Sequence, residues 1–237
     1  PYEGASRAAT SAFLFRGYGR ASYSPPKYIA PEGWDPSRNV SKLLGDPTSV
    51  LVVVNKTRPL NPATYAPSDL VAVSPVPGGS NQRMRREAAT ALASMYKAAS
   101  AQGLYFSVAS SYRSYATQKS LFNSYAANYG VARAETFSAR PSYSEHQTGW
   151  TADLSDGGGC RISKCFGDTT VGKWVAQNGH KYGFVIRYPA GKTSVTGYIY
   201  EPWHVRYVGV DLSTYMHDNG VKTLEEQFKL PSAPHYN

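Results

Sequence analysis

Residues 144–153 have the sequence SEHQTGWTAD, and residues 201–204 have the sequence EPWH. Together they offer two imidazoles and, at Asp153 and Glu201, two carboxylates. Three nitrogen or oxygen ligands from a protein leave the fourth position of a tetrahedral zinc ion to water, as in catalytic zinc sites. The sequence therefore predicts one zinc ion held by His146, Asp153 and His204, with Glu201 as the general base beside it.

The spacing within the first stretch has a physical explanation. Gly149 gives the backbone a flexible point after His146, and residues 150–154 alternate as a short strand does, so Asp153 can return to the face that His146 addresses. Glu145, next to a predicted ligand, is expected to face solvent. The alternative is that the two histidines and the two acids are ordinary core or surface residues. That alternative is reasonable for any one of these residues, but much less so for all of them together.

The second stretch contains a proline between its two functional candidates. Pro202 has no backbone donor and a fixed φ, so Glu201 and His204 are not expected in the middle of a helix or in the interior of a central strand. On a straight strand, residues three apart face opposite sides. The pair is therefore predicted at a strand end or a bend.

The pattern Ser-x-His-x-x-Gly-x-Ala-x-Asp followed by Glu-x-x-His resembles the signature of the LAS metallopeptidases, and in detail that of the VanY-type D-alanyl-D-alanine carboxypeptidases of bacterial cell walls. Three further parts of the chain resemble the same family, at residues 54–71, 110–118 and 223–226. The resemblance runs from roughly residue 50 to residue 230 and does not cover the start of the chain. The family matches in the signature fall on Ser144, His146, Gly149, Ala152 and Asp153.

The resemblance implies a substrate and further site residues. The substrate class is the peptidoglycan stem peptide, cut before a C-terminal D-alanine, so we expect a D,D-carboxypeptidase. Arg113 is implied to stabilise the oxyanion or hold the substrate, although it could instead be a surface ion-pair partner. Gln118 and Ser144 are candidates for binding the peptide. The alternatives are an L,D-carboxypeptidase, a peptidoglycan endopeptidase, or a non-catalytic zinc-stabilised wall-binding module, which the presence of Glu201 disfavours.

The order of apolar patterns predicts an α+β fold, with an antiparallel sheet, helices packed on one side and the zinc site in a cleft on the open face. Residues 48–237 are predicted to form the peptidase domain, and residues 1–47, which show no sustained period, an irregular extension packed on or near it. Helices are predicted from Ser80 to Gly103, from Ser114 to Gly130, and from a cap at Asp168 to Gly179. Strands are predicted at 51–54, 104–109, 183–188, 197–200 and 205–208.

Composition limits the partners and the location. The net charge of +9 favours acidic partners, such as anionic wall polymers. The basic residues are scattered and accompany no binding motif, so we expect no nucleic acid. No apolar run approaches the length of a membrane span. The first residues lack the basic start and apolar core of a signal peptide, which suggests the mature form of a secreted or wall-associated protein, expected to be a monomer.

The chain has two cysteines, Cys160 and Cys165, in a glycine-rich loop after the metal stretch. A structural zinc site usually needs four ligands, so two cysteines alone are weak support for a second metal. A disulfide that closes this loop is the preferred interpretation over free thiols, and it implies an oxidising, extracytoplasmic setting.

Overall fold

The computed structural model describes residues 36–236 of the chain. Most of the segment predicted as an irregular extension, residues 1–35, lies outside the described residues. Helix α2 (Pro36–Gly45) occupies part of that segment, so the prediction of irregular structure is wrong for residues 36–45. Leu44 near its end is buried in a cluster with Leu51 and Leu212, and this long-range packing is not visible in the local sequence.

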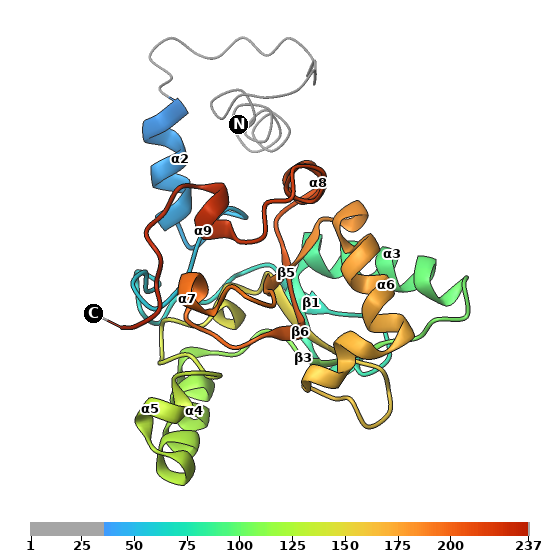
Figure 1. The fold of residues 1–237 in the computed structure, drawn as a ribbon, viewed down its shortest axis with the longest axis horizontal. Coiled ribbons are helices and arrows are strands. Elements are labelled where there is room, and N and C mark those ends of the chain that lie inside the picture. The colour runs from blue at the N-terminus through green and yellow to red at the C-terminus, as the bar shows by residue number, and fades with distance from the viewer. Residues whose placement is uncertain (1–35, 237) are drawn as a thin grey trace.

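A four-stranded antiparallel sheet forms the centre of the domain, in the order β3 (Ser107–Ser110), β4 (Thr151–Ser155), β6 (Glu201–Tyr207) and β5 (Phe184–Tyr188). A second, two-stranded sheet joins β1 (Leu70–Ala72) to β2 (Arg83–Arg85). Helices surround the large sheet, as Figure 1 shows. The predicted α+β class with an antiparallel sheet is confirmed.

The two faces of the large sheet are different in character. On one face, Leu154 and Val205 belong to the main apolar cluster with residues of α3 (Arg86–Ser100) and α6 (Thr170–Asn178). Because side chains alternate along a strand, their neighbours Asp153 and His204 point to the other face. That second face is also buried, but by polar and charged side chains. The sheet therefore separates an apolar core from a polar interior that holds the predicted site.

The three predicted helices form, and two of them begin later than predicted. Helix α3 starts at Arg86 rather than Ser80, because residues 83–85 pair with β1. Helix α4 (Tyr115–Tyr129) has its predicted cap, since Ser114 Oγ accepts a hydrogen bond from the Thr117 backbone N–H. Helix α6 is capped by Thr169 and not by Asp168. The remaining α-helices of the described residues are α5 (Val131–Ala134), α7 (Thr193–Thr196), α8 (Val210–Asp218) and α9 (Leu224–Gln227).

Two predicted strands are absent from the described part of the chain. Residues 51–54 are buried as expected, but the backbone N–H of Val53 bonds to the carbonyl of Leu44 instead of a neighbouring strand. Residues 197–200 follow α7, where Gly197 has a φ of 82° and the Ile199 N–H bonds to the carbonyl of Thr136. Among the described helices, none has both the length and the apolar character needed to cross a membrane.

Candidate metal centre

Three separate pieces of backbone deliver the predicted ligands. His146 comes from a short 3₁₀ helix (Glu145–Thr148) that ends at Gly149. Gly149 has a φ of 74°, and a Cβ there would come within 2.9 Å of Arg85 Cγ, so glycine is required at this turn. Strand β4 follows and presents Asp153 directly opposite His204 of β6 in the ladder. The turn and the register together bring the three side chains to one point.

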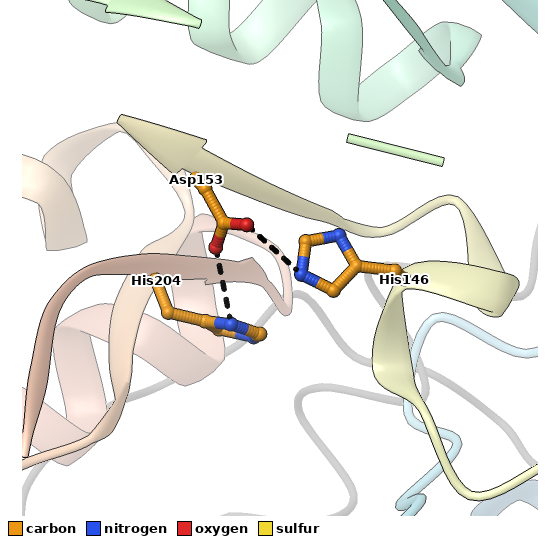
Figure 2. Close-up of side chains that lie close together, drawn as sticks. All are labelled: His146, Asp153 and His204. Carbon is orange, nitrogen blue, oxygen red and sulfur yellow. Dashed lines mark ion pairs between the residues drawn. The ribbon is translucent and has the colours of Figure 1, made fainter. Parts of the chain in front are cut away.

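The three side chains are buried and close enough to share an ion (Figure 2). His146 Nε2 lies 3.3 Å from Asp153 Oδ2, and His204 Nδ1 lies 3.3 Å from Asp153 Oδ1. One ligand atom from each residue lies within 4.8 Å of the others. All three residues are at most 4% exposed. This geometry suits a single metal ion.

Their hydrogen bonds fit a metal as well. His146 Nδ1 lies 2.7 Å from the Ser111 carbonyl oxygen, which can only accept, so Nδ1 carries the proton and Nε2 keeps its lone pair toward Asp153. Asp153 Oδ1 is buried, and its contact to His204 Nδ1 at 3.3 Å lacks the geometry of a hydrogen bond. A buried carboxylate oxygen left in this state is compensated when a cation binds beside it.

The site carries an excess of negative charge around His204. Burial alone would lower the pKa of His204, but the carboxylates of Asp153, Glu145 and Glu201 outweigh burial and raise it to about 9. The same burial, together with the charge of Arg113, lowers the pKa of His146 to about 4 despite Asp153. The donor atoms and the surplus of carboxylates therefore fit a divalent cation such as zinc.

Glu201 lies next to this centre because β6 is irregular at its start. Tyr188 pairs with Glu201 while Ile186 pairs with Val205, so β6 holds two more residues than β5 in this interval. The irregularity turns Glu201 toward the side of His204, and its Oε2 lies 3.5 Å from His204 Nδ1. Glu201 is the first residue of the strand, as predicted, but His204 lies in the interior of β6 between β4 and β5, so the prediction of a strand end or bend is wrong for His204. Pro202 falls in the irregular interval, where a strand tolerates proline. Burial, assisted by Asp153 and opposed by His204 and Arg113, raises the pKa of Glu201 to about 8.

The centre opens into a cavity of about 600 Å³. Arg113, in the turn after β3, lines it; its backbone N–H donates to the His146 carbonyl at 3.2 Å. Its Nε is buried and has no partner among the described residues, so it is available to a ligand. Ser144 also lines the cavity. Gln118 is not one of the lining residues; it is 1% exposed, and its Nε2 donates to the carbonyl of Ala139 at 2.7 Å, which braces a segment of the cavity wall.

The prediction for Glu145 is wrong. This residue was expected to face solvent, yet it is 1% exposed and accepts hydrogen bonds from Arg187 Nε at 2.8 Å and Arg206 Nη1 at 3.0 Å. Its second oxygen, Oε2, lies 3.8 Å from His204 Nε2. Burial by itself would raise the pKa of Glu145, but the two guanidinium groups hold it well below its usual range. Glu145 is therefore a permanent buried anion behind a predicted ligand.

The charged network extends from Glu145 to both ends of the domain. Arg187 also donates to Glu225 of α9, at 2.9 and 2.7 Å, and Glu225 accepts from Asn55 Nδ2 at 2.9 Å. Arg187 and Arg206 are almost fully buried. One signal for this network was present in the sequence: each arginine stands inside a predicted strand of apolar residues, where a charge needs an acidic partner.

Two imidazoles and a carboxylate, buried at the end of an open cavity beside a glutamate and an arginine, form the kind of site that zinc hydrolases use. The family model for VanY, D-alanyl-D-alanine carboxypeptidase, matches residues 81–210, more than half of the chain. The chain belongs to this family of LAS metallopeptidases, as its sequence motifs predicted.

Known proteins of the family resemble the chain over most of its length. The Bacillus subtilis protein YodJ is 42% identical over 190 residues, which cover 78% of this chain and 68% of YodJ. The structure of the LdcB LD-carboxypeptidase is 41% identical with a TM-score of 0.72 and covers 78% of this chain and 88% of that one. A variant of the vancomycin resistance D,D-pentapeptidase VanY in complex with Zn(II) is 32% identical with a TM-score of 0.64, covering 75% and 98%.

Proposed function

We propose that the chain is a zinc-dependent carboxypeptidase that removes a C-terminal D-alanine from peptidoglycan stem peptides. The observation that carries this proposal is the buried cluster of His146, Asp153 and His204, with Glu201 and Arg113 lining the same cavity. The Zn(II) bound by the VanY neighbour supports zinc as the metal. The disulfide between Cys160 and Cys165 supports an extracytoplasmic location at the wall.

The side chains that line the cavity have different roles in the proposed reaction. A zinc ion held by the three ligands would supply a Lewis acid for the scissile carbonyl and lower the pKa of a bound water molecule. Glu201, as a carboxylate, accepts the proton of the attacking water and later donates it to the leaving amine. A cation at the ligands favours the carboxylate form of Glu201. Arg113, whose Nε is free of other partners, donates to the developing oxyanion or to the substrate.

The wall of the cavity also shapes peptide binding. Ser144 binds the peptide in this proposal, which its position among the lining residues of the cavity supports. Gln118 acts on the substrate only through the segment that it braces, because its amide bonds to the Ala139 carbonyl. Such positioning matters, since small misplacements of a substrate reduce rates strongly.

The residue before the terminal D-alanine distinguishes two specificities. The family model and the VanY neighbour favour D,D-activity, while the identity of 41% to the LdcB LD-carboxypeptidase favours L,D-activity as a second candidate. We expect zinc-loaded protein to release one alanine from a muramyl pentapeptide and to leave the tetrapeptide intact, as followed by mass spectrometry. Release from the tetrapeptide instead would assign L,D-activity. Cleavage only of cross-linked wall would assign an endopeptidase, and no cleavage with zinc bound would indicate a wall-binding module.

Removal of one ligand tests the metal site directly. We expect Asp153→Ala to weaken zinc binding by more than the roughly 10- to 100-fold that loss of an outer partner costs. The affinity is measured by competition with a chromogenic chelator, and the zinc content by elemental mass spectrometry. Asp156→Ala is the matched control, because Asp156 lies on the following loop and, within residues 36–236, its hydrogen bonds go to loop backbone. Equal zinc affinity in both variants would contradict the assignment.

A further inference from the structure

The loop between β4 and α6 is fastened at several points. Cys160 and Cys165, the two cysteines of the chain, form a disulfide across it. Before the disulfide, Asp156 Oδ1 accepts hydrogen bonds from two backbone N–H groups of the loop, at 2.9 and 3.2 Å. Within it, Arg161 Nη2 donates to the carbonyl of Ala109 in β3 at 3.4 Å. The loop therefore has a defined position beside the sheet.

Ile162, in the middle of this disulfide-closed loop, combines two unfavourable features. Its φ is 46°, in the left-handed region that β-branched side chains rarely adopt. Its side chain is 44% exposed, so apolar burial in the fold does little to offset the strain. Residues held in sparsely populated backbone conformations cluster at active sites and ligand clamps.

Ile162 lies where a ligand of the metal centre can contact it. Ile162 lines the cavity of the metal centre, together with Ser110 of β3 and Trp203 of β6. Ser110 is paired with Asp153 in the sheet, so this part of the cavity lies beside a predicted metal ligand. An exposed aliphatic side chain at that place is available to whatever occupies the cavity.

The loop and helix α4 form different parts of the same cavity. Leu121 and Tyr125 of α4 line it, as does Ile162. In Figure 1, α4 and α5 and the loop that precedes α6 lie on opposite sides of the strands. The lining of the cavity therefore includes aliphatic and aromatic side chains from α4 and an aliphatic side chain from the disulfide-closed loop.

We propose that the disulfide-closed loop Cys160–Cys165 is a specificity wall of the cavity, in which Ile162 contacts an aliphatic part of the bound peptide. The inference rests on the proposed function and extends it to a residue outside the catalytic group. The disulfide holds the loop tip so that the strained Ile162 points into the cavity. Substrates with an aliphatic group at this place bind more tightly than substrates with a polar one.

Replacement of Ile162 by glycine separates binding from stability. Glycine tolerates a positive φ, so Ile162→Gly is expected to fold with an unchanged or higher melting temperature. Loss of the aliphatic contact is expected to raise KM for the pentapeptide roughly tenfold, at the low end of what one lost apolar contact costs, with kcat changed less than about twofold. Ile162→Leu, which keeps an aliphatic side chain, is expected to retain KM within about twofold by the same reasoning.

Direct binding and a matched control complete the test. Titration calorimetry of the pentapeptide into Glu201→Ala protein, with and without Ile162→Gly, should show the same roughly tenfold loss of affinity. Val210→Ala removes most of a similarly exposed aliphatic side chain outside the cavity and should leave KM unchanged. A double Cys160→Ser and Cys165→Ser variant should raise KM in the direction of Ile162→Gly.

The outcomes are distinct. Wild-type turnover of a stem peptide with KM unchanged in Ile162→Gly would overturn the specificity wall and leave the proposed function standing. An equal rise of KM in Ile162→Leu and Ile162→Gly would also overturn it, because an aliphatic contact is then not what matters. Wild-type protein that neither cleaves nor binds the stem peptides would overturn the specificity wall together with the proposed function.

Discussion

Replacement of Glu201 by glutamine is expected to lower kcat by about 10²- to 10⁴-fold, the range that a positioned general base contributes. The amide has nearly the shape of the carboxylate but cannot accept the proton of the attacking water. Glu201 contacts His204 at 3.5 Å, so the zinc content of the variant must be measured beside its rate. Release of D-alanine slowed by this factor, with zinc retained, is the expected result.

One control variant and two contrary outcomes make the Glu201 experiment decisive. Glu226→Gln changes an exposed glutamate that pairs with Lys192, far in sequence from the metal ligands, and should keep full activity. A Glu201→Gln variant with wild-type kcat would assign the base elsewhere. A variant that loses its zinc would show that Glu201 mainly supports the ligands.

Replacement of Glu225 by alanine is expected to lower the free energy of unfolding by about 3–5 kcal/mol, the cost of removing one partner from a buried ion pair. Glu225 is 0% exposed, and its carboxylate accepts two hydrogen bonds from Arg187 and one from Asn55. Of the two carboxylates that pair with Arg187, Glu145 and Glu225, the variant retains only Glu145. Urea unfolding followed by circular dichroism measures the difference.

The neighbouring residue provides the matched control for Glu225. Glu226→Ala removes a carboxylate whose side chain is 35% exposed, whose charged partner Lys192 is also partly exposed, and which accepts a hydrogen bond from Thr223 Oγ1 at the start of α9. Such surface pairs contribute about 0–1 kcal/mol, so the loss should stay near that range. Similar losses in the two variants would mean that the buried network does not stabilise the fold beyond an ordinary surface pair.

The ligand triad could be predicted because its residues are rare types at a motif spacing. His146, Asp153 and His204 meet through a glycine turn and a strand register, and both leave local marks in the sequence. The sheet and the helices α4 and α6 could be predicted for the same reason, since alternation and helix caps are local signals. The triad, the sheet and these two helices could therefore be predicted with little knowledge of contacts to distant parts of the chain.

The errors have a common physical origin in long-range contacts. Glu145 has the local environment of a surface residue, and only Arg187 and Arg206, more than forty positions away in one case and sixty in the other, make it a buried anion. Residues 51–54 have the composition of a strand, but their partners are the Leu44 carbonyl and the side chain of Arg206. Neither contact is encoded in a window of neighbouring residues.

The buried charged network around Arg187 also bears on how far the chain can be shortened and still fold. Asn55 and Glu225 are both outside residues 81–210, the part that carries the family's recognisable sequence. A fragment trimmed to that part would retain every predicted metal ligand and Glu201, yet would leave Arg187 in its interior without Glu225. Truncations intended for expression or crystallisation should therefore begin before Leu44 and end after Leu230, because residues of both flanks also pack together in one apolar cluster.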